Sequence, residues 1–137
     1  MDFLTPEKRS QLMSRVRGRN TKPELVVHRI VRQLGYRFRA CHPSLPARPD
    51  LVFPSAHKVI FVHGCFWHRH YRCQKATVPK TRSAFWRNKF EQNKLRDRAK
   101  LRQLRRRGWK ALILWECETQ FPDKLRDRIR HYLENGR

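Results

Sequence analysis

The segment Val62–Cys73 brings together three kinds of side chain that could do chemistry. Imidazoles can ligate a metal ion or move a proton near neutral pH, thiolates can ligate a metal ion, and large apolar rings can insert between stacked bases. The side chains concerned are His63, His68 and His70, Cys65 and Cys73, and the adjacent pair Phe66 and Trp67. An ordinary surface loop needs no such mixture, so this segment is the first candidate for a functional site.

Four side chains in and beyond this segment have the composition of a zinc site. Four residues separate Cys65 from His70, two separate His70 from Cys73, and Cys117 follows a predicted strand that could bring it close. Thiolates and imidazole match the borderline softness of Zn²⁺, and a site with four protein ligands has no open position for catalysis. We therefore expect a structural zinc ion that crosslinks the loop to the core. The alternative is a set of buried free cysteines and a surface histidine.

A second set of residues is typical of a magnesium-dependent nuclease. Asp50 begins a predicted strand, and His63 and His68 follow the next strand. Mg²⁺ takes oxygen ligands, often one or two carboxylates with phosphate and water, and it polarises the phosphate or activates the water. An imidazole can deprotonate that water or protonate the leaving oxygen. Asp50 alone would be ordinary turn chemistry after Pro49, so the prediction depends on the three residues together.

The aromatic residues indicate how the protein could test DNA. Phe66 and Trp67 adjoin one another, and Trp86 lies near the start of a predicted basic helix. Such rings are core residues in most proteins, but proteins that deform DNA insert apolar side chains between base steps and offset the cost of unstacking with phosphate contacts. Lys89 and Asn93 share a helical face with Trp86, where they could meet a phosphate or a base edge.

The composition points to a polyanionic partner. The chain has 137 residues, enough for one domain with a single core, and carries 33 Lys and Arg against 11 Asp and Glu, a formal charge of +22. A charge of this size would oppose compaction unless much of it faced a polyanion, above all nucleic acid. Between residues 69 and 107 there are 15 Lys and Arg and two acids, Glu91 and Asp97. The phosphate footprint is therefore predicted to lie beside the aromatic residues.

The sequence also bears on the compartment. Residues 1–10 contain no apolar run of the signal-peptide kind, and no segment approaches the length of an apolar membrane span. We expect a soluble, cytoplasmic protein that works on the nucleoid. In a reducing compartment, closely spaced cysteines with histidines between them favour metal binding over disulfides.

Local signals predict the elements that must position these residues. Residues 1–20 are predicted to form a basic arm or short helix that contacts DNA, and residues 21–137 a single domain. Thr21–Glu24 has the form of a capping box at the start of a helix that ends at Gly35, and capping by itself accounts for Glu24. Further elements are strands over 36–40, 50–53, 58–62 and 109–115, the last of them central, a basic helix over 82–107 that ends at Gly108, and a final helix over 122–133. This order predicts a mixed sheet covered by helices, an α/β or α+β architecture.

Several motifs, taken in order, resemble those of one family. They are Met13-Ser14-Arg15, Thr21-Lys22-Pro23-Glu24, Arg48-Pro49-Asp50, His63-Gly64-Cys65-Phe66-Trp67-His68, Pro79-Lys80-Thr81-Arg82, Phe85-Trp86, and Gly108-Trp109 followed by Trp115-Glu116-Cys117. The ordered set covers nearly the whole chain and resembles the very short patch repair DNA mismatch endonucleases. The resemblance implies a restriction-endonuclease-like fold, a structural zinc ion, and Mg²⁺-dependent nicking of duplex DNA on the 5′ side of the thymine in a T:G mismatch. Such mismatches arise when 5-methylcytosine deaminates.

The resemblance also implies roles for individual residues. Asp50 would ligate Mg²⁺ together with the backbone carbonyl of Val62, and His68 would be the general base for water. His63 would assist at the scissile phosphate, and Glu24 would belong to the active site as well as to the helix cap. The fold superfamily usually carries an acidic-x-Lys element where this chain has Val62 and His63, so metal binding would depend on one carboxylate, phosphate and waters.

On the DNA side, the resemblance implies that Phe66, Trp67 and Trp86 enter the stack beside the mismatch, while Met13 approaches from the other groove. The expected partner is mismatched duplex DNA, the expected state is a monomer, and mismatch-repair proteins could be further partners. Two alternatives stay open. One is a nuclease of the same fold with another mismatch or sequence preference, and the other is a non-catalytic zinc module that binds nucleic acid.

Overall fold

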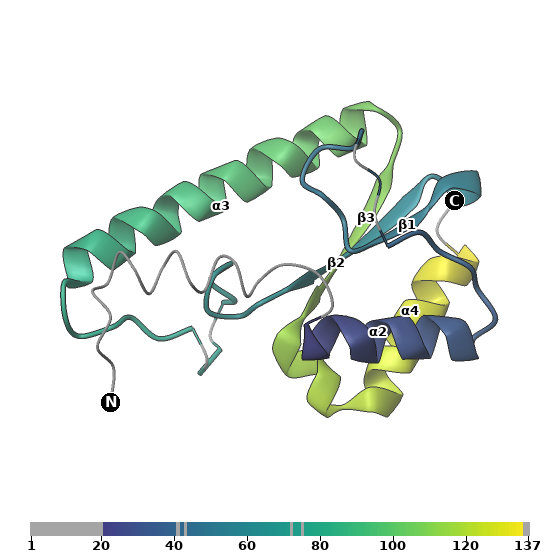
Figure 1. The fold of residues 1–137 in the computed structure, drawn as a ribbon, viewed down its shortest axis with the longest axis horizontal. Coiled ribbons are helices and arrows are strands. Elements are labelled where there is room, and N and C mark those ends of the chain that lie inside the picture. The colour runs from purple at the N-terminus through teal and green to yellow at the C-terminus, as the bar shows by residue number, and fades with distance from the viewer. Residues whose placement is uncertain (1–20, 41, 43, 72, 75, 136–137) are drawn as a thin grey trace.

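The computed structural model describes residues 21–40, 42, 44–71, 73–74 and 76–135, and its elements are arranged in three layers around a small mixed sheet (Figure 1). In chain order the elements are α2 Lys22–Gln33, β1 Leu51–Phe53, the 3₁₀ turn η1 Pro54–Ala56, β2 Lys58–His63, α3 Ser83–Arg106, β3 Lys110–Trp115, the 3₁₀ turn η2 Glu116–Gln120 and α4 Pro122–Asn135. The strand order is β1-β2-β3, with β1 antiparallel and β3 parallel to β2. The long connection between the parallel strands is α3.

The first layer consists of α2 and α4, which lie side by side against one face of the sheet (Figure 1). Apolar residues at helical spacing on α2, including Val27, Ile30 and Val31, pack with Leu125 and Ile129 of α4 and with the strands. Gly35 ends α2 with a φ of 90°, a left-handed conformation that glycine adopts without steric cost. This layer carries Glu24 and His28 toward the sheet, where both are buried.

The sheet is the second layer. The third layer is α3, which packs through Leu104 on Val52, Val59 and Phe61 at the other face of the sheet. Gly108 follows its end with a φ of 86°, as the sequence predicts for a helix stop. The amino-terminal half of α3 extends past the strands (Figure 1), where it meets the loop that follows β2. The helix thus connects the sheet core to the segment with the histidines and aromatic rings.

The mixed α+β architecture is confirmed, with two corrections to the predicted strands. The expected strand over 36–40 is reduced to a single bridge between Arg39 and Val52, because β1 has only three residues with which to pair. The last strand is not central: β2 has a neighbour on each side, whereas β3 has one in the described part of the chain. The sequence of β3 is nevertheless apolar, because helices cover both faces of the sheet.

The predicted arm over 1–20, with Met13, lies outside the described residues. Among the helices of the described residues, none is both long enough and apolar enough to cross a membrane.

Candidate active site and metal centre

The carboxylate of Asp50 is fixed against the backbone of β2. The Asp50 amide donates to the Ile60 carbonyl at 3.1 Å, and the Val62 amide donates to Asp50 Oδ2 at 2.6 Å. The N–H and C=O of one strand residue point toward the same neighbour, so the Val62 carbonyl faces the side on which Asp50 stands. One carboxylate and one carbonyl on the same edge fit Mg²⁺, which takes few protein oxygens and keeps several waters.

The chain reaches Asp50 through a strained turn. Ala47 and Arg48 have φ values of 69° and 46°, in the left-handed region that residues with a Cβ rarely occupy. Such a conformation costs about 1–2 kcal/mol per residue, and strain of this kind persists where surrounding contacts impose it. Asp50, which directly precedes the three-residue strand β1, therefore needs anchors in other elements.

His63 and His68 form a stacked pair that a carboxylate from α3 orients. Their ring centroids are 3.7 Å apart with an angle of 9° between the planes, and His68 Nδ1 lies 2.5 Å from Asp97 Oδ2. The nitrogen lone pairs lie in the ring planes, so two parallel stacked rings cannot both point at one metal ion. The trio is better suited to proton transfer, in which Asp97 holds Nδ1 and leaves Nε2 as the proton acceptor.

The four side chains predicted to bind zinc lie together. Cys65, His70, Cys73 and Cys117 each offer a ligand atom, and these four atoms lie within 4.8 Å of one another. His70 Nδ1 is 3.6 Å from Cys65 Sγ and 3.4 Å from Cys117 Sγ. A tetrahedral zinc ion with ordinary bond lengths separates sulfur from nitrogen by about 3.6 Å. The four ligand atoms therefore lie close enough together for the cluster to hold a metal such as zinc.

The chemistry of the thiols agrees with a metal centre. Burial raises the pKa of the Cys65 thiol to about 12, and burial also raises the pKa of Cys117. Thiolates in such a place require a cation, and a bound metal supplies one. The Cys65 amide donates to Glu116 Oε1 at 3.2 Å, which places the loop beside the segment that carries Cys117.

Trp115, at the end of β3, links two groups of side chains. One is the metal cluster, as we call Cys65, His70, Cys73 and Cys117, and the other is the histidine pair, His63 and His68. The His70 ring stacks on Trp115 at 4.3 Å with an interplanar angle of 13°, and the His63 ring meets the same indole edge-on at 5.3 Å. His63 in turn stacks on His68. Rings thus follow one another without interruption from a metal-cluster residue to the residue that Asp97 holds, and we call this series the ring column.

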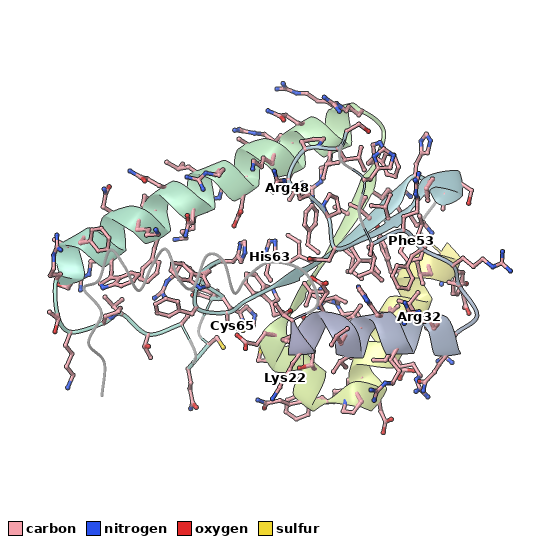
Figure 2. All side chains as sticks on the ribbon, in the orientation of Figure 1. Lys22, Arg32, Arg48, Phe53, His63 and Cys65 are labelled. Atoms are coloured by element: carbon pink, nitrogen blue, oxygen red, sulfur yellow. The ribbon has the colours of Figure 1, made fainter. Side chains whose placement is uncertain are left out.

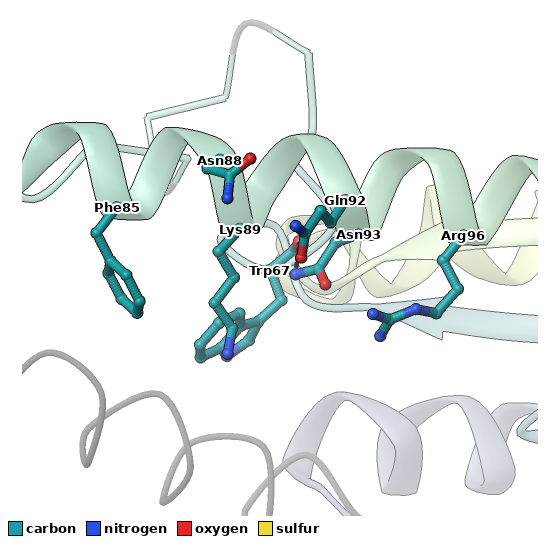
Figure 3. A pocket seen from close by; sticks show the side chains of 7 residues that line it. All are labelled: Trp67, Phe85, Asn88, Lys89, Gln92, Asn93 and Arg96. Atoms are coloured by element: carbon teal, nitrogen blue, oxygen red, sulfur yellow. Dashed lines mark hydrogen bonds between the residues drawn. The ribbon is translucent and has the colours of Figure 1, made fainter.

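The three rings predicted to enter the base stack, those of Phe66, Trp67 and Trp86, do not protrude in this structure. Trp67 is 4% exposed and Trp86 2% exposed, and both pack with Phe90, with Phe66 half-buried beside them. A pocket of about 260 Å³ lies between Trp67 and α3. Its other lining residues, drawn in Figure 3, are Phe85, Asn88, Lys89, Gln92, Asn93 and Arg96. Lys89 Nζ lies 5.6 Å from the centre of the Trp67 ring, and burial lowers the pKa of Lys89. The Asn93 amide donates to the Trp67 carbonyl at 3.4 Å, so it fastens the loop to α3.

Arg69 clamps the same loop. Its guanidinium donates to the carbonyls of Phe66, Ala76 and Thr77 at 3.1, 2.7 and 3.0 Å and lies 3.9 Å from the centre of the Phe90 ring. Burial lowers the pKa of Arg69. Arg69 belongs to the basic segment that the sequence assigns to phosphate binding. In the structure its guanidinium holds the loop instead.

Glu24 is buried on α2, and the capping-box interpretation of it is wrong. The Thr21 side chain makes no capping hydrogen bond. Glu24 is 4% exposed, and its Oε2 lies 3.9 Å from Nε2 of His28, one turn further along the helix. The residue therefore faces the interior between α2 and the sheet, where a carboxylate can take part in a site.

The structure brings together most of the predicted site and adds residues that the sequence did not single out. His63 is the last residue of β2 and Cys65 stands two residues after it, and both lie between α3 and α2 in the view of Figure 2. Asp97 and Trp115 are the additions beside them. The sequence held one signal for Asp97, a carboxylate in the midst of a basic helix, and one for Trp115, its place in the last motif of the family resemblance, although neither signal indicated a contact with the histidines.

Comparison with known proteins gives consistent matches. The family model described as DNA mismatch endonuclease Vsr matches residues 1–75. The type II nicking enzyme V.XorIIP of Xanthomonas oryzae pv. oryzae is 44% identical over 133 residues, 97% of each chain. The DNA mismatch endonuclease Vsr of Escherichia coli is 41% identical over 119 residues, which cover 87% of this chain and 76% of that protein. The type II nicking enzyme V.NmeAIP of Neisseria meningitidis is 34% identical over 128 residues, 93% of this chain and 91% of the other.

Proposed function

Since this chain belongs to the Vsr family of DNA mismatch endonucleases and is a DNA endonuclease, we propose that it nicks duplex DNA at T:G mismatches with Mg²⁺ as cofactor. The proposed cut lies on the 5′ side of the thymine, and the proposed fold is restriction-endonuclease-like. The observation that carries the proposal is the convergence at the end of β2: the Asp50 carboxylate lies against Val62, and the histidine pair with Asp97 begins at the next residue.

In the proposed mechanism, the side chains around β2 divide the work. Asp50 and the Val62 carbonyl would hold Mg²⁺, which would supply positive charge to polarise the scissile phosphate. His68 takes a proton from the attacking water at Nε2, because Asp97 occupies its Nδ1. The Asp97 carboxylate then stabilises the imidazolium through a charge-assisted hydrogen bond. His63, stacked on His68, assists at the phosphate and limits the orientations of the His68 ring, the general base.

The four cluster residues would hold the proposed zinc ion, which would fix the position of the loop after β2 and would take no part in the chemistry. Cys65 and Cys73 come from the loop after β2, whereas Cys117 comes from the turn after β3. A closed site of this kind crosslinks the two segments and offers no open coordination position for chemistry. A fixed His70 would hold Trp115 in place by stacking on it. Trp115 in turn would restrain His63, and His63 would restrain His68.

We propose that mismatch recognition requires the aromatic cluster to open. A ring of Phe66, Trp67 or Trp86 would leave its packed position and enter the base stack, and phosphate contacts from α3 would offset the cost of unstacking. A wobble pair resists opening less than a Watson-Crick pair, which couples recognition to cutting. The arm with Met13 is proposed to approach from the other groove, and Lys89 and Asn93 to contact DNA once the loop has moved.

Labelled duplexes test the proposed function directly. T:G and T:A duplexes and the corresponding single strand should be incubated with the protein in Mg²⁺ or in EDTA. The expected result is a single nick in the T:G duplex that requires Mg²⁺ and lies on the thymine strand. Binding without any metal-dependent nick would favour the non-catalytic module. Efficient nicking of another mismatch would point to a different specificity on the same site.

Replacement of Asp97 by asparagine is expected to slow nicking by about a hundredfold with little change in DNA affinity. Asparagine keeps the size of the side chain, but it cannot stabilise an imidazolium as a carboxylate does, and general base catalysis contributes factors of this size. Single-turnover rates on the T:G duplex provide the measurement. The matched control is Glu91→Gln, which removes the other acid between residues 69 and 107. Equal rates for the two variants would remove Asp97 from the mechanism.

A further inference from the structure

Arg69 connects three parts of the structure, and the proposed mechanism gives it no role. Its guanidinium donates to the carbonyl of Phe66 at 3.1 Å and to the carbonyls of Ala76 and Thr77 at 2.7 and 3.0 Å. Its Cζ lies 3.9 Å from the centre of the Phe90 ring of α3. A planar guanidinium can donate several hydrogen bonds in a fixed fork and stack on an aromatic face at the same time. One side chain therefore fastens the loop after β2 both to the segment after the metal cluster and to α3.

The bond to Phe66 opposes the opening that the proposed recognition step requires. The rings of Phe66 and Trp67 pack with two rings of α3, so they reach a base stack only if they leave this aromatic cluster. The Arg69 guanidinium also lies 5.6 Å from the centre of the Phe66 ring. A shift of Phe66 away from α3 would break its hydrogen bond to Arg69 and take its ring away from the guanidinium. The contacts of Arg69 therefore belong to the packed state of the loop and stabilise that state against the open one.

The backbone of Arg69 is strained in the packed state. Its φ is 56°, in the left-handed region that residues with a Cβ rarely occupy. Such strain persists where surrounding contacts impose it. The hydrogen bonds of the Arg69 side chain hold the chain both before and after this residue, at Phe66 and at Ala76. Release of the loop would relieve the strain, so the side chain and the backbone of one residue act on the loop in opposite directions.

We propose that Arg69 is a latch: its guanidinium stabilises the packed position of Phe66 and Trp67 and thereby sets how readily these rings leave for a base stack. The inference deepens the proposed recognition step and rests on it. Arg69 acts on the rings and not on the reacting atoms, so it is a positioning residue. The stacking and phosphate contacts of a bound mismatch offset the cost of releasing it. The apparent affinity for a mismatched duplex is then reduced by the small fraction of protein molecules that are open.

Replacement of Arg69 by lysine distinguishes a latch from a phosphate contact. Lysine keeps the charge and most of the length, but an ammonium has no planar fork for three carbonyls and no face to stack on Phe90. We expect the open fraction of the free protein to rise about tenfold, the scale of a hydrogen bond to a charged group. Arg87→Lys is the matched control, because Arg87 is an exposed arginine of α3 next to the buried Trp86, and it should leave the open fraction unchanged.

The indole N–H of Trp67 reports the open fraction directly. Its Nε1 is buried and has no hydrogen-bond partner among the described residues, so burial alone protects the proton from exchange with solvent. Hydrogen exchange followed by NMR should be about tenfold faster at this proton in Arg69→Lys, while the backbone amides of β2 exchange at the parent rate. Faster exchange at both sites in equal proportion would show that Arg69 only supports the fold and would overturn the inference, as would an unchanged rate at Trp67.

Affinity for DNA gives a second test without turnover. In EDTA, Arg69→Lys should bind the T:G duplex about fivefold to tenfold more tightly than the parent does, because more of the protein is already open. A lost phosphate contact or a damaged loop would instead weaken binding, and unchanged or weaker binding would overturn the inference. If the parent itself shows no preference for the T:G over the T:A duplex, the proposed function has failed, and the exchange rate at Trp67 alone decides whether Arg69 is a latch.

The parent protein offers a test for the case in which Arg69→Lys does not fold. In the free protein the bonds to the three carbonyls should hinder rotation of the Arg69 guanidinium, and ¹⁵N NMR should resolve separate Nη signals. These signals should merge in the complex with the T:G duplex, because the latch has been released. Separate signals that persist at unchanged shifts in that complex would overturn the inference.

Discussion

Replacement of Asp50 by alanine is expected to abolish Mg²⁺-dependent nicking of a T:G duplex and to leave most of the DNA affinity intact. Among the residues that the structure describes, Asp50 is the carboxylate that accepts a hydrogen bond from the Val62 amide of β2, so we expect no described neighbour to take over its role as the proposed Mg²⁺ ligand. A loss of about a thousandfold or more corresponds to about 4 kcal/mol of transition-state stabilisation. Affinity should persist because a protein of formal charge +22 binds phosphates over a wide surface.

The isosteric change Asp50→Asn sharpens this experiment. The alanine variant also leaves the Val62 amide without its acceptor, which costs about 1–3 kcal/mol if the amide stays buried. Asparagine can keep an oxygen at that position while it removes the charge, so the fold should be retained and nicking should still be lost. Asp127→Ala, a change at a residue whose side chain is 69% exposed on α4, serves as the control and should nick normally. Retained nicking in both Asp50 variants would contradict the proposed mechanism.

Removal of the proposed zinc ion is expected to have the second largest effect. A chelator, or Cys117→Ser, should lower the melting temperature by roughly 10 °C and slow nicking by about a hundredfold. The loss of stability follows from the broken crosslink between the loop after β2 and the turn after β3. The loss of activity follows from the release of His70, which stacks on Trp115 and through it restrains His63.

The measurement combines metal content with calorimetry and single-turnover nicking. Elemental analysis should give one zinc ion per parent chain and less than a tenth of that in Cys117→Ser. Cys41→Ser, at the remaining cysteine of the sequence, is the control and should keep its zinc. Unchanged folding and nicking in a zinc-free protein would show that the cluster does not position the catalytic histidines.

Local signals in the sequence were sufficient for what depends on neighbours along the chain. Helix ends at Gly35 and Gly108 were predictable because a left-handed residue after a helix favours glycine. Three of the four members of the metal cluster fall within nine residues, so their spacing alone predicts a common site. Asp50 and the histidine pair were predictable because two short apolar runs separated by four residues favour adjacent strands.

Contacts between distant segments were not predictable in the same way. Asp97 reaches His68 across 29 positions, a contact that depends on the direction of α3 rather than on any local pattern. The strand expected over 36–40 has the right alternation, but the length of its partner decides the outcome, and β1 offers only three residues. Trp67 and Trp86 look available for DNA in the sequence, whereas tertiary packing places both in an aromatic cluster with Phe90.

The ring column also gives this enzyme a built-in optical reporter. The Trp115 indole touches the imidazole of a metal-cluster residue on one side and that of a proposed catalytic residue on the other. Imidazolium quenches indole emission by contact, so Trp115 fluorescence would register both the loading of the cluster and the transfer of a proton to the neighbouring histidine pair. The part of the emission change that disappears in Trp115→Phe would isolate this signal, and a stopped-flow trace could then place these events in time relative to the opening of the mismatch.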